Sequence, residues 1–207
     1  MEPLIKSLQI CIKYIRCPSA IRIAEDETRS NPASLCHEVW HAILRAPKWE
    51  DLDDLLELIN SIVDEGADIV IEERKTREEE VDWLSGVMAK MEKGRGVHVV
   101  AEVDGIVVAS SEVTRGGFRC ESHLGSLGII VRSDYRDVGI GTETMKVLLE
   151  QARIMGLKVA TLTAFSTNPR AIHVYEKVGF RETGRIPKGF YKNGSYIDRV
   201  IMTADLV

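Results

Sequence analysis

The sequence predicts a mixed α/β domain built on a largely antiparallel sheet. Three observations support this fold class. Apolar residues recur at helical spacing over residues 52–63 and 81–91, runs rich in β-branched residues lie outside these helical segments, and Asp-Gly and Asn-Gly pairs mark hairpin turns. From residue 39 the expected order is a strand, two helices, three strands, a helix, a strand, a helix and two strands.

The domain is expected to begin with a strand and two helices. The run VWHAIL, at residues 39–44, predicts the strand. A helix follows over residues 50–66, because leucines and isoleucines recur on one face and acidic residues fill the first turn, where the helix dipole favours them. Thr76 and Glu79 form the capping-box pattern that starts the second helix, which stops at Gly94.

A hairpin and a strand–helix–strand run are expected next. Asp104-Gly105 separates two apolar runs, as in a tight β-hairpin. Residues 124–131 predict a further strand, and a glycine-bearing turn leads from it into a helix over residues 140–155. The run KVATLTAF, at residues 158–165, predicts the next strand.

The last helix and hairpin carry clear boundary signals. Asn168 is an N-cap residue, Pro169 fits the first helical turn, and Gly179 ends the helix. The tail, residues 180–207, predicts two strands around the Asn193-Gly194 turn. No internal repeat or low-complexity tract interrupts this pattern.

The first 37 residues differ from the rest of the chain. Residues 9–15 alternate weakly, as in a strand, whereas residues 25–34 are polar and typical of a loop or linker. We therefore interpret residues 1–37 as an N-terminal extension of unknown role and residues 38–207 as the domain.

Composition excludes several classes of protein. The 207 residues are 44% hydrophobic and 29% charged, which is enough apolar material for one globular domain and excludes a wholly disordered chain. The net charge of -5 disfavours nucleic acid as a direct partner, because phosphate binding needs a basic surface. No apolar run approaches the roughly 18 residues that cross a bilayer, and the N-terminus lacks a signal-peptide core. We expect a cytoplasmic protein without a membrane partner.

The segment with the strongest chemical signal joins a strand to a helix. After Gly128-Ile129-Ile130-Val131 and four more residues comes Arg136-Asp137-Val138-Gly139-Ile140-Gly141-Thr142. Glycines let the backbone approach a ligand, and the free N–H groups and dipole of a helix N-terminus favour anions. The segment predicts a pyrophosphate cradle, and an ordinary strand-to-helix turn is the alternative.

This segment resembles the [RQ]xxGx[GA] signature of the GNAT superfamily of N-acetyltransferases. The run from Asn168 to Phe180, NPRAIHVYEKVGF, is similar to the second block of that superfamily, and the distance between the two blocks fits one helix plus one strand. The resemblance covers residues 39–207. It implies a central, largely antiparallel twisted sheet with helices on both faces, and acetyl-CoA as cosubstrate.

The resemblance also implies roles for single residues. Backbone groups at Ile129 and Val131 would pair with the pantetheine arm, and an N–H near them would stabilise the thioester oxygen. Tyr175 stands where the family has its general acid, with a core aromatic as the alternative. Asn168 is a helix cap, a cofactor contact or both. The pyrophosphate would lie against the residues of the glycine-bearing turn, which are Arg136, Asp137, Val138, Gly139, Ile140, Gly141 and Thr142. Two further cations, Arg170 and Lys177, are solvated helix charges unless they reach a CoA phosphate.

The general base is not clear from the motifs. Some relatives carry a Glu five residues before the motif Asn, but Thr163 stands there in this chain. His123, near the start of the predicted strand, is our candidate base, and Glu112 and Glu121 are the other candidates. A base acting through water, or an acceptor that arrives neutral, also stays open.

The acceptor is expected to be cationic. The region of the first two helices is acidic, which either attracts a cationic acceptor or forms a solvated face. We therefore expect direct acetyl transfer, in a ternary complex, to a primary amine such as a protein lysine or N-terminus, by a monomer or homodimer. A GNAT-like domain that binds CoA without transfer, for regulation or interaction, is the alternative. The acidic residues are Asp64, Glu65, Asp68, Glu72, Glu73, Glu78, Glu79 and Glu80.

The histidine and cysteine patterns do not favour a metal site. His37-Glu38-Val39-Trp40-His41 matches the HExxH zinc-hydrolase pattern, whose chemistry needs a helix to bring both histidines to one metal. On a strand they stand roughly 13 Å apart. A zinc hydrolase is our third hypothesis, and we expect no metal. The cysteines fit no zinc or disulfide spacing and are expected to be reduced thiols: Cys11, Cys17, Cys36 and Cys120.

Overall fold

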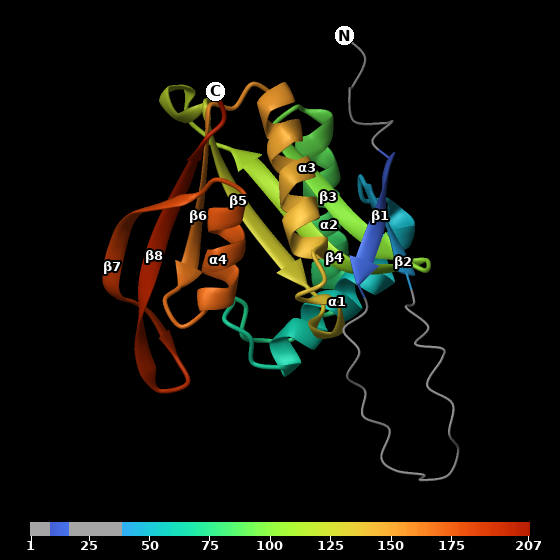
Figure 1. The fold of residues 1–207 in the computed structure, drawn as a ribbon, viewed down its shortest axis with the longest axis horizontal. Helices are drawn as coiled ribbons and strands as arrows, with labels where there is room; N and C mark the ends of the chain where they lie inside the picture. The colour runs from blue at the N-terminus through green and yellow to red at the C-terminus, as the bar shows by residue number, and fades with distance from the viewer. Residues whose placement is uncertain (1–8, 17–38) are drawn as a thin grey trace, which may run out of the picture.

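The computed structural model describes the backbone of residues 9–16 and 39–207, and side chains from residue 41 onward. Eight strands of this described part form one sheet in the order β1-β2-β3-β4-β5-β6-β8-β7 (Figure 1). The strands are β1 Gln9–Arg16, β2 Val39–Arg45, β3 Gly96–Val103, β4 Ile106–Arg115, β5 Leu124–Val131, β6 Val159–Phe165, β7 Arg181–Lys192 and β8 Ser195–Asp205. The helices are α1 Leu52–Asp64, α2 Arg77–Glu92, α3 Ile140–Ile154 and α4 Pro169–Lys177.

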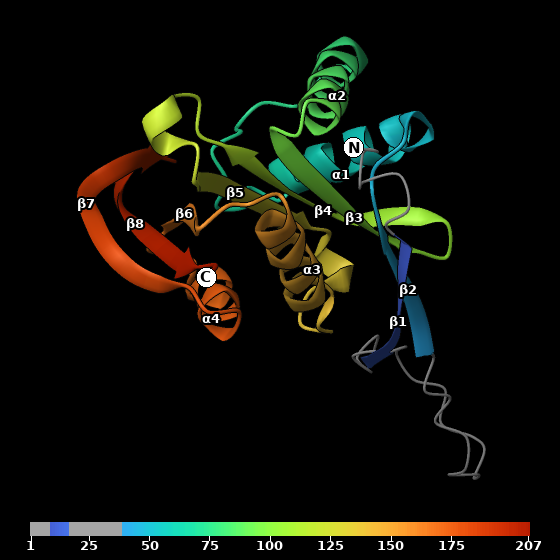
Figure 2. The same cartoon turned by 90° about the horizontal axis from the view of Figure 1, so that it is seen from above.

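The sheet lies between two layers of helices. Helices α1 and α2 cover one face, and α3 and α4 cover the other (Figure 2). Alternate residues of each central strand therefore enter different cores. Val99 packs in the core beneath α3, whereas Val100 packs in the core beneath α1 and α2. The predicted mixed α/β fold, with helices on both faces, is confirmed.

One pair of neighbouring strands separates along its length. All strand pairs of the described sheet are antiparallel except β5 and β6, which are parallel. Their pairing covers only residues 124–126 of β5 and 159–161 of β6. Beyond these residues the two strands diverge toward their carboxyl ends (Figure 1). This divergence leaves an opening in the middle of the sheet.

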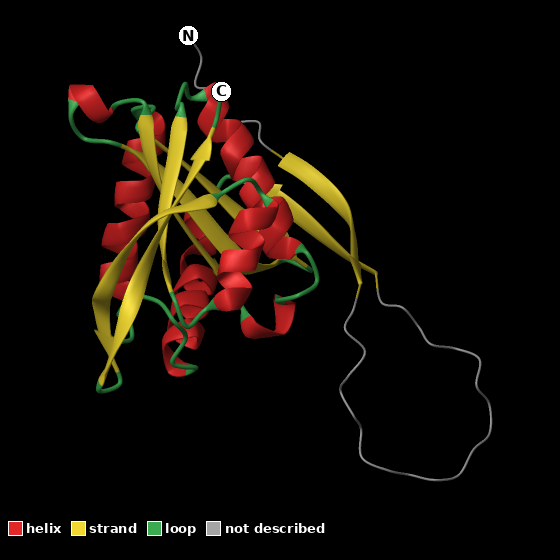
Figure 3. Cartoon of the chain, turned by 60° about the vertical axis from the view of Figure 1, so that its left-hand side comes forward, coloured by secondary structure: helices red, strands yellow, loops and turns green. Residues whose placement is uncertain are grey.

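The turn and cap signals in the sequence are confirmed. Asp104 has φ 51° and Gly105 has φ 83°, the left-handed backbone of a type I′ hairpin turn. The Thr76 hydroxyl accepts the Glu79 N–H at 3.2 Å, and α2 begins at the next residue after Thr76. The Asn193-Gly194 turn likewise joins β7 to β8, which form a long twisted hairpin at one edge of the sheet (Figure 3).

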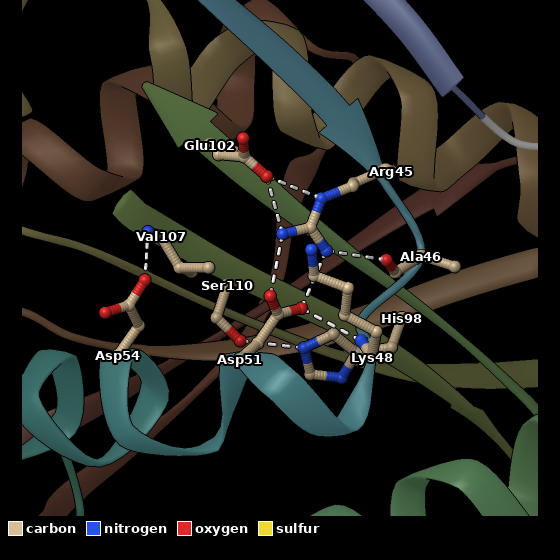
Figure 4. Close-up of polar contacts among 9 residues, drawn as sticks. All are labelled: Arg45, Ala46, Lys48, Asp51, Asp54, His98, Glu102, Val107 and Ser110. Carbon is tan, nitrogen blue, oxygen red and sulfur yellow. Dashed lines mark hydrogen bonds and ion pairs between the residues drawn. The ribbon is translucent and has the colours of Figure 1, made fainter. Parts of the chain in front are cut away.

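The beginning of α1 is fixed to the sheet by charged groups. The Arg45 guanidinium of β2 donates to both oxygens of Asp51, at 2.6 and 2.7 Å, and to Glu102 of β3 at 2.8 Å (Figure 4). These bonds to carboxylates raise the pKa of Arg45. Asp54 of α1 accepts the Val107 N–H of β4 at 3.0 Å. Because β2 and β4 both bond to its beginning, α1 has a fixed position on the sheet.

The N-terminal strand extends the sheet. Strand β1 pairs antiparallel with β2, which confirms the strand expected at residues 9–15. The polar segment 25–34 lies outside the described residues, and the domain boundary after residue 37 stays a prediction. None of the helices in the described part of the chain has the length and apolar character that a membrane-spanning helix needs.

The HExxH pattern does not fall on a helix where the structure describes it. His41 lies on strand β2, whereas His37 and Glu38 lie outside the described residues. Residues 9–16 and 39–207 contain no group of three or more His, Cys, Asp or Glu side chains that could hold a metal ion. Cys120 is an exposed free thiol.

Candidate functional site

The opening between β5 and β6 exposes backbone groups of β5. Arg132 N–H donates to the Val108 carbonyl at 2.9 Å, and Gly116 N–H donates to the Leu124 carbonyl at 3.0 Å. Antiparallel pairs alternate between bonded and non-bonded positions, so the even-numbered residues of β5 bond to β4. The N–H and C=O groups of Leu127 and Ile129 therefore point toward the opening, where β6 has already diverged. An extended ligand with amide groups can pair with them there.

A cavity of about 700 Å³ passes through this opening. Its walls come from α1, the α1–α2 loop and α2 on one face of the sheet, from strands β3 to β8, and from Tyr175 of α4 on the other face. Most of its titratable groups are acidic, namely Asp68, Glu79, Glu80, Asp82 and Glu112. The cavity thus connects an acidic space under α2 with the α4 side of the sheet.

The arginine of the signature, Arg136, bonds to other residues of the protein. Arg136 donates its Nε–H to the Val131 carbonyl at 2.8 Å, and its guanidinium pairs with Glu65 just after α1. It therefore holds the end of β5 and the end of α1 together. The role predicted for Arg136 was a pyrophosphate contact, and in this structure the side chain positions the last residue of β5.

The glycine-bearing turn leaves the first turn of α3 open. Gly139 is the N-cap with φ 96°, a left-handed backbone that favours glycine, and no side chain caps the helix. The first helical bond runs from Glu143 N–H to the Gly139 carbonyl at 3.0 Å, so the N–H groups at 140–142 have no described backbone partner. A Cβ added to Gly141 would lie 3.5 Å from Cγ2 of Val131, so the backbone of Gly141 lies close to that side chain.

The other residues of the turn hold it in place. Asp137 pairs with Arg170 of α4 at 2.6 Å, which accounts for one of the two cations that the sequence left open. Val138 packs against the core beneath α3, and Ile140 is buried in it. The second cation, Lys177, is exposed at the end of α4.

Tyr175 and Asn168 lie on the same short helix with different surroundings. Tyr175 lines the cavity and packs edge-on against Phe180, with ring centroids 6.2 Å apart. Burial raises the pKa of Tyr175 to about 12, so its phenol keeps its proton at neutral pH. Asn168 caps α4, because its Oδ1 accepts the Ala171 N–H at 3.0 Å. The cap predicted for Asn168 is confirmed.

The three candidate bases lie in different places. His123 is exposed one residue before β5, at the end where β5 and β6 are still paired, and is not part of the cavity wall. Glu121 is exposed in the loop before it and is also outside that wall. Glu112 of β4 lines the cavity, as does Thr163 of β6. Of these candidates, the structure brings only Glu112 to the cavity.

Glu80 was named from the sequence only as one of the acidic residues and was not predicted as a site residue. Its side chain lines the cavity and the residue is only 5% exposed, and burial raises its pKa. It has no hydrogen bond or ion pair among the described residues. A signal was present in the sequence, because position 80 continues the buried stripe of α2 formed by Leu84, Val87 and Met91.

His98 was also missed. It is 2% exposed and lines the cavity from β3, where its Nε2 lies 2.7 Å from the Ser110 hydroxyl (Figure 4). The Trp83 ring of α2 meets it edge-on at 5.3 Å. Burial lowers the pKa of His98 to about 4, so the ring is neutral at physiological pH.

Comparison with known families identifies the family of the chain. The sequence model of the Acetyltransferase (GNAT) family matches residues 49–180, more than half of the chain, including the glycine-bearing turn and both strands of the opening. The chain belongs to the acetyltransferase (GNAT) family. The family predicted from the two sequence motifs is thereby confirmed.

Two curated relatives are named as acetyltransferases of amino acids or amino-acid analogues. An L-methionine sulfoximine/L-methionine sulfone acetyltransferase of Pseudomonas paraeruginosa is 32% identical over 78 residues, which are 38% of this chain and 45% of that enzyme. The L-amino acid N-acetyltransferase AaaT of Escherichia coli is 31% identical over 105 residues, 50% of this chain and 65% of that enzyme. The matches thus cover less than two thirds of the length of each of these two relatives.

A solved GNAT structure shares the fold. The yncA protein of Salmonella typhimurium, determined with its cofactor acetyl-CoA, superposes with a TM-score of 0.72 over 79% of this chain and 93% of its own. Its sequence is 21% identical, so the similarity concerns the fold.

Proposed function

We propose that this GNAT protein transfers the acetyl group of acetyl-CoA to the primary amine of a free amino acid or similarly small acceptor, in a ternary complex. The observation that carries the proposal is the cavity that passes between β5 and β6, from the acidic space under α2 to Tyr175. A donor bound on one face and an acceptor bound on the other would meet in that opening. Bound acetyl-CoA supplies an acyl group activated as a thioester.

The chain offers groups that fit both polar parts of acetyl-CoA. The open N–H groups at 140–142 suit the pyrophosphate, since a helix N-terminus favours anions and Gly139 places no side chain before it. The inward-facing backbone of Leu127 and Ile129 suits the amides of the pantetheine arm. Val131 would complete this row, with its carbonyl oxygen held by Arg136.

The same groups supply the chemistry that transfer needs. A backbone N–H of β5 that faces the opening would donate to the thioester oxygen as negative charge develops on it. Tyr175 would give its proton to the departing sulfur, because its phenol is protonated at neutral pH and lies at the α4 end of the cavity.

The walls of the acceptor space favour a small molecule. The α1–α2 loop closes over the cavity and is fastened to β7, because the Lys192 ammonium donates to the carbonyl groups of Ala67 and Ile69. The same loop is tied to the β6–α4 connection, where the Thr167 hydroxyl donates to Asp68 at 2.8 Å. The two relatives named for amino acids point in the same direction. We therefore propose a free amino acid or similarly small amine as the acceptor, in place of the protein lysine or N-terminus that we expected from sequence.

A transfer assay tests this proposal. The release of CoA from acetyl-CoA is measured with a panel of L-amino acids, methionine sulfone, a polyamine and a lysine peptide, and the acetylated product is identified by mass spectrometry. We expect turnover with one or more free amines and little with the peptide. Turnover with the peptide alone would contradict a small acceptor and favour the protein acceptor that we expected from sequence. Binding of acetyl-CoA without any product would favour the domain that binds without transfer. The cytoplasmic location and the monomer or homodimer stay predictions.

A further inference from the structure

We infer that Glu80 of α2 binds the ammonium group of the acceptor where it enters the cavity and accepts one of its protons, so that a neutral amine moves on to the opening between β5 and β6 for the proposed transfer. The inference rests on the proposed function and names the residue that prepares the acceptor. In this step an N–H bond of the ammonium breaks, a Glu80 O–H bond forms, and a neutral amine with a free electron pair remains.

The first support is the burial of Glu80 without a partner. The residue is 5% exposed on the buried stripe of α2, yet its carboxylate has no hydrogen bond or ion pair in the described chain. Its oxygens open onto the cavity, and a carboxylate so largely removed from water is stabilised when a cation binds beside it. A ligand cation entering the cavity would provide that stabilisation, since Glu80 lines the cavity wall.

The second support is the charge of the surrounding groups. Lys75 is the one cation on the described cavity wall, and it pairs with Glu79 at 3.1 Å. His98, on the strand below, is neutral. Apart from Tyr175 at the α4 end, the remaining titratable groups on the cavity wall are carboxylates from the loop, from α2 and from β4: Asp68, Glu79, Asp82 and Glu112. A positively charged acceptor therefore finds a complementary space.

The third support is a continuous path from Glu80 to the opening. Trp83 lies one turn along α2 on the same side as Glu80, and its ring contacts His98 of β3. His98 pairs directly with Glu112 of β4, and Glu112 pairs directly with Gly128 of β5. Gly128 has no side chain, and a Cβ there would meet nothing within 4 Å. The row thus leads across two strand spacings, about 10 Å, to the opening.

The raised pKa of Glu80 suits the same task. A base works best when its pKa lies near the working pH, and burial raises the pKa of Glu80, with Glu79 adding to the rise and Lys75 opposing it. Glu112 lines the same cavity but is more exposed, so it is the competing base that the experiment must exclude.

The experiment compares the pH profiles of kcat/KM for the wild type, Glu80→Gln, Glu80→Asp and Glu112→Gln with one active free amine. Glu78→Gln, on the exposed side of α2 and outside the cavity wall, is the matched control. We expect Glu80→Gln to be slower by about 100-fold at pH 7. As the pH rises, the difference in kcat/KM between the wild type and Glu80→Gln should shrink about tenfold per pH unit, because more of the amine is already neutral in solution. The difference should disappear once the amine is fully deprotonated. Glu80→Asp should recover part of the rate, and Glu78→Gln should match the wild type.

Thermal unfolding separates this role from a structural one. Since Glu80 is buried without a partner, Glu80→Gln should keep or raise the Tm, whereas loss of a structural carboxylate would lower it. A wild-type pH profile in Glu80→Gln, or the predicted profile in Glu112→Gln instead, would overturn the assignment of Glu80 while the transferase stands. Absence of turnover in the wild type would overturn the proposed function and this inference together.

Discussion

Arg136 donates its Nε–H to the carbonyl oxygen of Val131 at 2.8 Å, which joins the glycine-bearing turn to the last residue of β5. The same guanidinium pairs with Glu65 at the end of α1. One side chain thus connects both sides of the sheet at the place where the strands separate. The arginine of the signature therefore fixes the end of β5, beside the site that we propose for acetyl-CoA.

Arg136→Lys should weaken acetyl-CoA binding about tenfold. Lysine keeps the charge, but its ammonium lacks the planar fork that reaches Val131 and Glu65 together, and a hydrogen bond from a charged group contributes about 1.5 kcal/mol or more. Calorimetric titration with acetyl-CoA measures the change. Arg185→Lys, in an exposed ion pair on β7, is the control and should leave affinity unchanged. If Arg136→Lys bound acetyl-CoA with the affinity of the wild type and of Arg185→Lys, the Arg136 bonds would not contribute to acetyl-CoA binding.

Gly139→Ala and Gly156→Ala form a matched pair at opposite ends of α3. Their φ angles are 96° and 86°, and at each position a Cβ would meet nothing within 4 Å. Each substitution should therefore lower the free energy of unfolding by about 1 kcal/mol through backbone strain. Only Gly139→Ala should also weaken acetyl-CoA binding, because only Gly139 precedes the open N–H groups. If both variants bound acetyl-CoA like the wild type, the pyrophosphate would not lie at this helix end.

Tyr175→Phe should lower kcat about 100-fold and leave the Kd for acetyl-CoA within about twofold. In the proposed transfer the phenol would supply a proton to the leaving group, and its removal leaves the packing against Phe180 in place. With the pKa of Tyr175 near 12, the wild type should lose no activity through this group below about pH 11. Tyr191→Phe, exposed on β7, is the control. Unchanged kcat in Tyr175→Phe would remove Tyr175 as the acid.

His98 should make the fold sensitive to acid. Its pKa is about 4 in the folded chain against an ordinary 6.5, so on acidification the unfolded chain takes up the proton first. The stabilisation is fully present above pH 6.5 and is lost as the pH falls toward 4. We expect the wild type to lose about 3 kcal/mol more than His98→Gln between pH 7 and pH 4, by denaturant unfolding. Parallel losses in both proteins would contradict a buried neutral His98.

Local signals in the sequence predicted most of the fold. Both hairpin turns, the Thr76 capping box and the Asn168 cap depend on neighbouring residues, and the structure has them all. The separation of β5 and β6 could not be predicted, because it depends on which distant strands pair and for how long. The family followed from two short motifs, whose separation along the chain fits one helix plus one strand.

The candidate site was harder to predict than the fold. Arg136 was predicted as a ligand contact. Its bonds to Val131 and Glu65 could not be predicted, because these residues come together only in the folded chain. His123 was chosen for its nearness to β5 in sequence, although it lies at the closed end of that strand. Glu80 was grouped with the acidic residues that either attract a cationic acceptor or form a solvated face, because the run of glutamates in the sequence concealed its place on the buried stripe of α2.

The measurement that tests the central claim most directly is a calorimetric titration of the metal-free protein with acetyl-CoA, alongside Gly139→Ala and Gly156→Ala. The account predicts saturable binding of one acetyl-CoA per chain, weakened in Gly139→Ala and retained in Gly156→Ala. Absence of saturable binding to the folded wild type would contradict the account, since the opening between β5 and β6 and the first turn of α3 would then not form an acetyl-CoA site.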